Sequence, residues 1–404
     1  MVAKLDIQIS DYTYQLPKER IAKYPLAIRD ASKLLVYHNN QMFDNTFKSI
    51  SKCIPKGSLI VSNNSKVIPA RLFFKKDTGA LIEVFCLEPF EPADYQGMFM
   101  QTTSCVWNCI VGNLKKWNAS ILKTTISIDN KETTLCAELI KSNQNDQLIR
   151  FSWNPEDKSF SDILDAFGKI PIPPYLERET ENIDLQRYQT IYSKTRGSVA
   201  APTAGLHFTP SIIENIHNSG SKCAEITLHV GAGTFKPIKS EYVTGHEMHR
   251  EFFEVQKETI ELLINHKGNI VSVGTTSLRT LESLYWIGIA MQNNDYSLHV
   301  QQWQAYKSHS NISLKESLNE ILLYLENNNK TSLNASTSIF IIPGYQFKVV
   351  SQLITNFHQP QSSLILLVAA FIGDEWKEIY NHALNHDYRF LSYGDSSILS
   401  RKKV

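Results

Sequence analysis

The sequence predicts an α/β main domain, with a mixed and mainly parallel sheet and flanking helices, that carries an inserted small antiparallel β-barrel domain. Two observations predict this fold. Strand-like and helix-like segments alternate from about residue 161 to residue 290, whereas the block before them consists of short strand-like runs without helices. The length of 404 residues also favours more than one domain.

Residues 1–65 begin the α/β domain. A helix-prone stretch around residues 17–23 precedes a predicted strand at 33–37. The apolar run at 57–62 is bounded by a turn and predicts a buried strand. We therefore assign residues 1–65 and 156–404 to one discontinuous α/β domain.

Residues 66–155 form the predicted inserted β-barrel domain. Their strand-like runs are rich in β-branched and aromatic residues and are separated by Gly, Asn or Asp turns; they cover 81–87, 104–111, 119–128, 133–140 and 147–153. Short strands at regular spacing, with no helical period between them, are typical of a small antiparallel barrel or sandwich.

The chain after residue 160 returns to alternating elements. Strands are predicted at 225–230 and 269–273, and helices near 257–266 and from about 276, which is the pattern of a parallel sheet. Residues 291–334 contain Asn- and Gln-rich runs around one amphipathic stretch, so we expect them to form a surface insertion with one helix.

Composition excludes several classes of protein. The apolar fraction of 42% excludes global disorder, and 41 basic against 40 acidic residues argue against a non-specific polyanion coat. Six cysteines are too sparse for a disulfide framework, and the N-terminus has no apolar signal segment. The longest apolar run, 364–372, is less than half of a membrane span of roughly 20 residues. We expect a cytoplasmic protein without a membrane partner.

Two short motifs resemble metal sites but lack the necessary spacing. Cys105 and Cys109 are followed by no further ligand at zinc-finger spacing. His246 and His249 lack the i, i+4 separation of a helical zinc site. The sequence therefore predicts no metal.

Three strand-to-helix junctions contain residues suited to a ligand pocket. They are the runs VAAPTAGLHF (199–208), TLHVGAGTF (227–235) and VGTTSLR (273–279). Glycine permits close approach of the backbone to a ligand, and a helix N-terminus attracts a carboxylate or phosphate. Each junction alone is compatible with an ordinary tight turn. Because open α/β sheets bind ligands at the carboxyl ends of their strands, three junctions in one domain favour a shared pocket.

The sequence resembles a known family through nine runs in order along the chain. They are SNNSKVIPARL (62–72), PPYL…YQTIYS (173–193), AAPTAGLHF (200–208), TLHVGAGTF (227–235), HEMHRE (246–251), VGTTSLRTLES (273–283), PGYQFKVV (343–350), ITNFHQP (354–360) and RFLSYGD (389–395). The family is the S-adenosylmethionine:tRNA ribosyltransferase-isomerases of queuosine biosynthesis.

The resemblance implies a reaction and its partners. Family members transfer the ribosyl part of S-adenosylmethionine to 7-aminomethyl-7-deazaguanine at the wobble position of tRNA and rearrange it to an epoxycyclopentanediol, which gives epoxyqueuosine. Adenine and methionine are released. The resemblance also implies an α/β catalytic domain with an inserted barrel, S-adenosylmethionine as co-substrate, and neither a prosthetic group nor a metal. We expect a monomer whose partners are tRNA and S-adenosylmethionine.

This chemistry requires groups that move protons. Histidines near their ordinary pKa suit both the removal and the donation of a proton. The expected catalytic residues are His207, His229 and His358, with Asp395 to orient a cation or ribose hydroxyls.

Ligand contacts are expected on the same junctions and on basic residues. The expected substrate-binding residues are Thr203, Gly205, Gly231, Gly233, Thr234, Thr275, Thr276, Ser277, Arg279, Asn356 and Tyr393. The expected RNA-binding residues, available for phosphates, are Arg71, Lys75, Lys76, Lys115 and Lys116.

Three alternatives remain open from the sequence. A diverged paralogue would perform the same chemistry on another base or RNA, because residues 104–117 and Arg250 depart from the family pattern. An S-adenosylmethionine-dependent methyltransferase would need a complete Gly-rich first turn, of which Gly231 and Gly233 supply only part. A non-catalytic RNA-binding module would use the three junctions as structural turns only.

Overall fold

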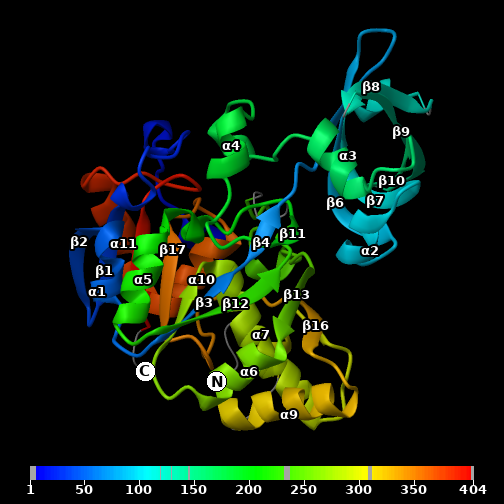
Figure 1. Ribbon diagram of the computed structural model, residues 1–404. Helices are drawn as coiled ribbons and strands as arrows, with labels where there is room; N and C mark the ends of the chain where they lie inside the picture. The colour runs from blue at the N-terminus through cyan, green and yellow to red at the C-terminus, as the bar shows by residue number, and fades with distance from the viewer. Residues whose placement is uncertain are drawn as a thin grey trace.

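The computed structural model describes residues 6–118, 120–128, 130–143, 146–231, 237–307 and 312–401 (Figure 1). Its largest element is a ten-stranded mixed sheet. Across the sheet the strands follow in the order β15 (His299–Val300), β16 (Ser332–Thr337), β13 (Glu251–Gln256), β12 (Lys222–Leu228), β3 (Leu59–Asn63), β14 (Ile270–Val273), β17 (Gln352–Asn356), β18 (Ser396–Ser400), β1 (Lys33–His38) and β2 (Gln41–Thr46).

The centre of this sheet is parallel. Strands β12, β3, β14 and β17 run in one direction, and β18 is antiparallel to β17. The carboxyl ends of the four central strands therefore meet at one edge. Strand β18 runs the other way, so the residues just before it lie at that same edge. This edge is where open α/β sheets bind ligands.

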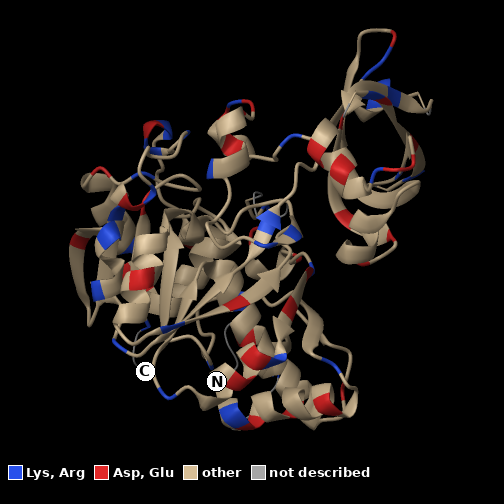
Figure 2. Ribbon diagram, in the orientation of Figure 1, with Lys and Arg blue, Asp and Glu red and all other residues tan. Residues whose placement is uncertain are grey.

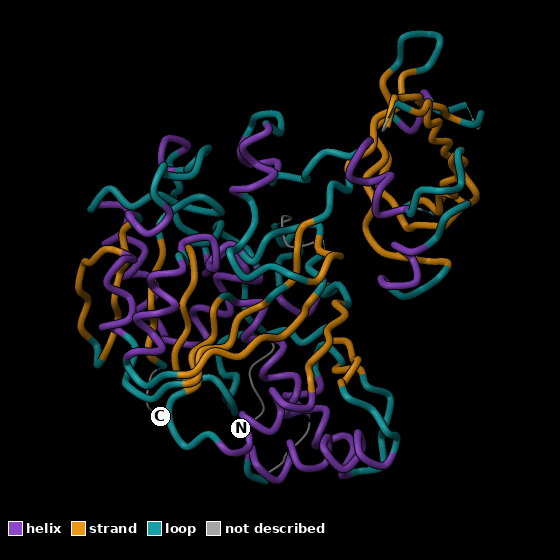
Figure 3. Tube along the Cα trace, viewed as in Figure 1, coloured by secondary structure: helices purple, strands orange, loops and turns teal. Residues whose placement is uncertain are grey.

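Helices cover both faces of the sheet (Figures 1 and 3). They are α1 (Ile50–Cys53), α5 (Pro210–Asn218), α6 (Lys257–Asn265), α7 (Thr275–Gln292), α8 (Gln304–Lys307), α9 (Leu314–Asn327), α10 (Ser363–Ile372) and α11 (Trp376–Asn385). The short helix α4 (Asn182–Arg187) lies beyond the strand ends rather than on a face of the sheet (Figure 1).

Alternation along the central strands explains why both faces carry helices. In β3, Leu59 and Val61 join the core that includes α7 and α10, whereas Ile60 joins the core that includes α1 and α5. All five residues of β3 are buried. A strand buried on both faces is a continuous apolar run rather than an alternating one, which is why residues 57–62 predicted a buried strand.

A second, six-stranded antiparallel sheet has its own core. Its order is β5 (Arg71–Lys75), β6 (Leu81–Glu91), β7 (Ser104–Gly112), β10 (Gln147–Asn154), β9 (Lys131–Ser142) and β8 (Leu122–Ile128). Strands β5 and β8 lie side by side, so the sheet is a nearly closed barrel (Figure 3). Trp107 and Phe151 are fully buried inside it, with α2 (Tyr95–Met100) and α3 (Phe160–Phe167) packed against it. The predictions of a mixed sheet with flanking helices and of a small antiparallel barrel are confirmed.

The chain passes between the two sheets at a short parallel ladder. Strand β4 (Ser65–Val67) leads out of the large sheet and pairs with β11 (Thr195–Ser198), which leads back to it. The helix-prone stretch around residues 17–23 forms only the 3-10 helix η2 (Lys18–Arg20). Ile21 instead makes an isolated parallel bridge to Phe390.

Residues 291–334 do not form the surface insertion that the sequence predicted. Strands β15 and β16 extend the large sheet, and Leu318, Ile321 and Leu325 of α9 are fully buried in the main core. A side chain on Gly288 of α7 would clash with the main-chain oxygen of Ser317, so α7 and α9 pack at backbone distance. The prediction was wrong because polar runs at the ends of the segment hid the apolar face of its helix. Among the described residues, no helix has the length and apolarity to cross a membrane.

Candidate substrate cleft

A cleft opens at the carboxyl ends of the parallel strands. Three chain segments, 200–204, 274–276 and 355–359, line most of it, and the other lining residues are Tyr175, Val230, Ser362, Leu364, Leu391 and Ser392. The cleft encloses roughly 690 Å³, open solvent at its mouth included.

The floor of the cleft is the N-terminus of α7. Gly274 precedes the helix with φ of 90°, a conformation that L side chains rarely adopt, and no side chain caps the helix there. The first main-chain N–H groups of an α-helix have no intrahelical acceptor. Thr275 and Thr276 line the cleft, and the buried Thr276 Oγ1 has no hydrogen-bond partner among the described residues. This end of α7 therefore offers donors to an anionic ligand group.

A hydrogen-bonded chain of three side chains lies beside the cleft. Ser32 Oγ contacts His207 Nδ1 at 2.9 Å, and Asn356 Nδ2 contacts His207 Nε2 at 3.2 Å. Because an amide nitrogen can only donate, Nε2 accepts and the proton of the neutral imidazole lies on Nδ1. Asn356 lines the cleft, whereas His207 lies behind it, and Asn356 Oδ1 has no partner within the described residues. His207 thus fixes the orientation of an amide that lines the cleft.

His358 is the candidate histidine that lines the cleft itself. Its Nε2 lies 2.8 Å from Thr355 Oγ1. The main chain of His358 is held as well, because its N–H donates to Tyr380 Oη at 3.1 Å and its carbonyl accepts from Tyr14 Oη at 2.5 Å. The imidazole therefore has a fixed position at the cleft wall.

The third candidate histidine lies at the contact with the barrel. The ring of His229 stacks on Tyr95 of α2 with centroids 3.9 Å apart. A side chain on Gly197 would clash with His229 Nδ1, so only glycine fits there. His229 Nδ1 is buried and has no partner among the residues described. Val230, the next residue, lines the cleft, but His229 does not.

All three imidazoles are neutral in the unliganded protein at neutral pH. Burial lowers the pKa of His207 and of His229 from 6.5 to about 4, and that of His358 to about 3. Nearby Asp395 raises the pKa of His207, but by less than burial lowers it. The expectation that these histidines titrate near their ordinary pKa is therefore wrong. At neutral pH these imidazoles therefore carry no second proton to donate, and a pKa so far below 7 makes each of them a weak base.

Three of the expected site residues are committed to other partners. The guanidinium of Arg279 pairs with the buried carboxylate of Glu251 in β13. The carboxylate of Asp395 accepts from the main-chain N–H groups of Lys33 and Arg389, at 3.0 and 2.8 Å. It also accepts from the Arg389 guanidinium at 3.1 Å, so the cation that Asp395 orients is a residue of the protein.

Tyr393 also points away from the cleft. Its hydroxyl donates to Asp184 Oδ1 at 2.8 Å. The carboxylate of Asp184 also accepts from Arg178 at 2.7 Å. Tyr393 thus belongs to a buried ion-pair network near α4.

The remaining predicted contacts divide between the cleft and its surroundings. Thr203 lines the cleft. Gly205 lies in the 3-10 helix η7 (Thr203–His207), where a side chain would clash with the Tyr192 hydroxyl, so its role is close packing. Ser277 is fully buried in α7 and does not line the cleft. Gly231 follows the lining residue Val230. The predictions for Gly233 and Thr234 lie outside the described residues.

A smaller hollow adjoins the cleft, and sequence reasoning missed its arginines. Arg29, Arg187, Arg389 and His207 line it, and Ser392 lines both spaces. Arg29 donates to the carbonyls of Gln189 and Leu206 at 2.9 and 3.0 Å. Within the described part of the chain, neither Arg29 nor Arg187 forms an ion pair with a carboxylate. Burial and the neighbouring Arg187 lower the pKa of Arg29 from its ordinary value, as expected where cations gather without counter-ions.

The expected RNA-binding residues lie on the barrel. Lys76 Nζ donates to the main-chain oxygen of Lys116 at 2.9 Å, which places Lys75 and Lys76 beside the 3-10 helix η5 (Leu114–Lys116). Arg71 instead pairs with Glu83 at 2.5 Å. In Figure 2 the turn after β5 lies at the end of the barrel far from the large sheet. These lysines can contact phosphates of a ligand bound in the cleft only if that ligand is long enough to reach the barrel.

The fold defines an α/β protein with a cleft at the carboxyl ends of its parallel strands and a small β-barrel beside it. A family described as "Queuosine biosynthesis protein" matches residues 9–399. The chain therefore belongs to the queuosine biosynthesis protein family.

Relatives that carry a functional name are similar over nearly their full length. A protein of Thermotoga petrophila named S-adenosylmethionine:tRNA ribosyltransferase-isomerase is 37% identical, over 97% of this chain and 100% of the relative. A protein of Polynucleobacter asymbioticus with the same name is 38% identical, over 98% of each. The crystal structure of S-adenosylmethionine tRNA ribosyltransferase from Thermotoga maritima aligns with a TM-score of 0.46 and 28% identity, over 96% of this chain and 99% of that one.

Proposed function

We infer that the protein is an S-adenosylmethionine:tRNA ribosyltransferase-isomerase of queuosine biosynthesis. Full-length similarity to relatives of that name supports the reaction class. We propose in detail that it transfers and isomerises the ribosyl part of S-adenosylmethionine onto 7-aminomethyl-7-deazaguanine at the tRNA wobble position. The products are epoxyqueuosine-tRNA, adenine and methionine. The observation that carries the proposal is the cleft at the α7 N-terminus, in a chain of this family.

The methionine end of S-adenosylmethionine is proposed to lie against α7. Its carboxylate would accept from the open main-chain N–H groups of the first turn, where the helix dipole also favours negative charge. Thr276 Oγ1 and Asn356 Oδ1 add a donor and an acceptor that have no partner among the described residues. A ligand with both a carboxylate and an ammonium group satisfies all of these atoms.

Proton removal is the proposed role of His358. The sulfonium acidifies the adjacent 5′ carbon of the ribose, and among the three candidate histidines His358 is the one that lines the cleft, so its neutral imidazole would be in reach to take the proton. His207 is a positioning residue, because it acts through Asn356. His229, whose Nδ1 has no partner among the described residues, is proposed to contact the substrate where the barrel meets the large sheet. Neither a metal nor a prosthetic group enters this proposal.

Two basic regions are proposed to hold the tRNA. Arg29 and Arg187 line the hollow next to the cleft and would contact phosphates near the modified base. Lys76 and Lys116 would contact a more distant part of the backbone. We also propose that residues 66–155 are an inserted domain that supplies this second contact, since they have a core of their own. We propose that the reaction takes place in the cytoplasm, as expected for an enzyme that acts on tRNA.

The decisive experiment measures the released products. The protein is incubated with S-adenosylmethionine and tRNA carrying 7-aminomethyl-7-deazaguanine, and adenine, methionine and tRNA modification are quantified together. We expect equal amounts of all three. S-adenosylhomocysteine would instead indicate a methyltransferase, and no release would indicate a binding module. Release of adenine with another RNA alone would retain the chemistry and contradict the base assignment.

Site variants test the assigned roles against a matched control. His358→Ala should slow turnover by roughly 10²–10⁴-fold with the fold retained, as expected for a group that transfers a proton. His217 is exposed on α5, away from the cleft, and H217A should keep the full rate. Full activity of H358A would show that this imidazole only supports the cleft wall.

A further inference from the structure

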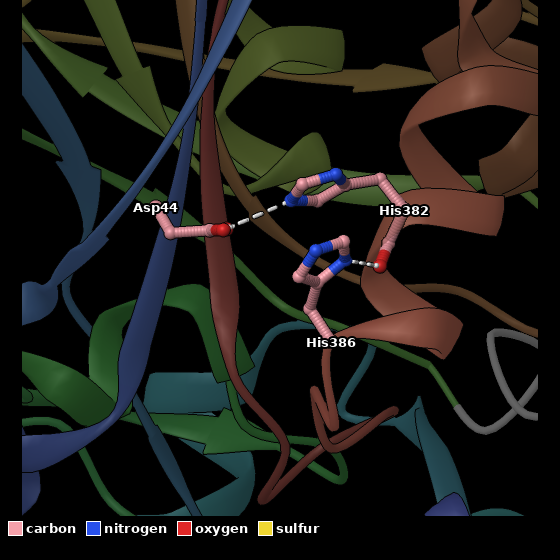
Figure 4. A group of neighbouring side chains, drawn as sticks. All are labelled: Asp44, His382 and His386. Atoms are coloured by element: carbon pink, nitrogen blue, oxygen red, sulfur yellow. Dashed lines mark hydrogen bonds and ion pairs between the residues drawn. The ribbon is translucent and has the colours of Figure 1, made fainter.

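A cluster of two histidines and one aspartate lies at the far edge of the large sheet (Figure 4). Asp44 lies on the edge strand β2, and His382 and His386 lie on the last turns and the C-terminal cap of α11. The two histidines are four residues apart. This is the i, i+4 spacing that His246 and His249 lack, and it places both imidazoles on one face of a helix.

The three side chains lie close together, and the two imidazole rings stack with their centroids 3.8 Å apart. One donor atom from each lies within 4.8 Å of the other two. His382 Nε2 lies 2.9 Å from one oxygen of Asp44 and 3.0 Å from the other. Ligands on a tetrahedral zinc, with bonds of about 2.0–2.1 Å, are about 3.3 Å apart. Because Asp44 and His386 are exposed, a small side-chain rotation closes this cluster around an ion.

Neighbouring groups already orient two of the ligands. His386 Nδ1 lies 2.8 Å from the main-chain oxygen of His382, so its proton is on Nδ1 and the lone pair of Nε2 is free. Tyr388 Oη donates to Asp44 Oδ1 at 2.6 Å. Metal-binding histidines commonly donate their second nitrogen to a carbonyl, and metal-binding carboxylates are themselves hydrogen-bonded. The cluster therefore has the outer contacts of a metal site as well as its ligands.

We propose that Asp44, His382 and His386 form a Zn²⁺ site that ties β2 to α11. Two imidazoles and one carboxylate are a zinc donor set, and water would occupy the fourth position. The ion would take the place of the proton between His382 and Asp44. Lys33 donates to the main-chain oxygen of His386 and, among the described residues, forms no ion pair with Asp44.

The site is structural and does not depend on the proposed reaction. Its ion would cross-link an edge strand to a helix whose other face supports the cleft, because Tyr380 of α11 accepts from the His358 N–H. Strand β2 pairs with β1 alone within the described chain, so its outer edge has no strand partner. A metal bridge to α11 would fix this edge.

The test is to titrate the full-length protein with Co²⁺ and to monitor binding by the visible absorption spectrum of the bound ion. Wild-type protein should bind one Co²⁺ with the visible spectrum of a tetrahedral site, and Zn²⁺ should displace it. Mg²⁺ should not, since it prefers oxygen ligands in an octahedral arrangement. Loss of an outer contact of a zinc ligand typically costs 10–100-fold in affinity, so H382A, H386A and D44N should each weaken binding by at least about 100-fold.

The matched control is the exposed His217 on α5, and H217A should bind as tightly as wild type. Zn²⁺ at about 100 times its Kd should also raise the melting midpoint of wild type by about 3 °C, and should not raise that of H382A. Alanine favours helix at position 382, and Asn keeps the shape of Asp44, so at least one variant should fold. Equal Co²⁺ affinity in the folded variants, or an equal loss in H217A, would overturn the proposal.

Discussion

Acid should destabilise this protein through its buried histidines, and the size of the effect follows from their pKa values. His207 and His229 have pKa values of about 4 and His358 of about 3, against 6.5 when exposed, because burial disfavours the charged imidazole. Between these values the unfolded chain binds protons that the folded chain does not. The free energy of unfolding therefore falls as the pH falls below 6.5.

The expected loss in the free energy of unfolding is large compared with the total stability of an ordinary protein. Lowering the pH from about 7.5 to about 5 should cost about 2 kcal/mol for each buried histidine, and about 6 kcal/mol for the three together. His358→Gln retains a partner for Thr355 Oγ1 and removes the titrating group. This variant should therefore lose about 2 kcal/mol less than wild type over the same pH range.

The assay is urea unfolding at several pH values, followed by the far-ultraviolet circular dichroism of the helices around the large sheet. His217→Gln is the control, because this side chain is exposed on α5 and its replacement should leave the pH dependence unchanged. An identical pH dependence in H358Q and wild type would refute the reasoning, since it would mean that His358 is protonated equally in folded and unfolded protein.

Three further perturbations test the packing, the cleft and the tRNA contact. Leu318→Ala should lower the free energy of unfolding by about 2–5 kcal/mol, because Leu318 is fully buried. Leu323 is exposed on the same helix, so Leu323→Ala should change the free energy of unfolding little. Equal urea midpoints for the two variants would contradict the burial of α9. Gly274→Ala and Gly57→Ala both strain a backbone with positive φ, but calorimetry should show weaker S-adenosylmethionine binding only for G274A. Arg29→Gln should reduce the slope of log K for tRNA against log salt by about 1, and an unchanged slope would exclude a phosphate contact.

The local sequence pattern predicted most strands, because the apolar residues and turn residues that specify a strand lie within it or directly beside it. Strand β14, with the sequence IVSV, is buried at every position and was predicted as an apolar run. The strand-to-helix junctions at 227–235 and 273–279 were also predicted to share a pocket, and Val230 and Thr275 both line the cleft. This follows because neighbouring parallel strands bring their carboxyl ends to one edge regardless of the distance between them in the sequence.

The partner that each side chain contacts could not be predicted in the same way. Arg279 follows a junction that lines the cleft, but one helical turn carries it to Glu251 in another strand. The leucines of α9 lie in a chain segment with polar ends, and only the packing against α7 shows that they are core. In each case the partner comes from a segment that the local sequence does not specify.

The sequence by itself determined the two kinds of sheet, most of their strands and the junctions that surround the cleft, since periodicity and turn residues act over a few residues. Only the tertiary structure decided which atoms meet there. Ser32 and Asn356 are 175 and 149 residues from His207, yet both hold its ring, and the resulting burial sets its pKa. The physical reason is that desolvation and hydrogen bonding depend on the order of strands across the sheet, which no single segment of the chain contains.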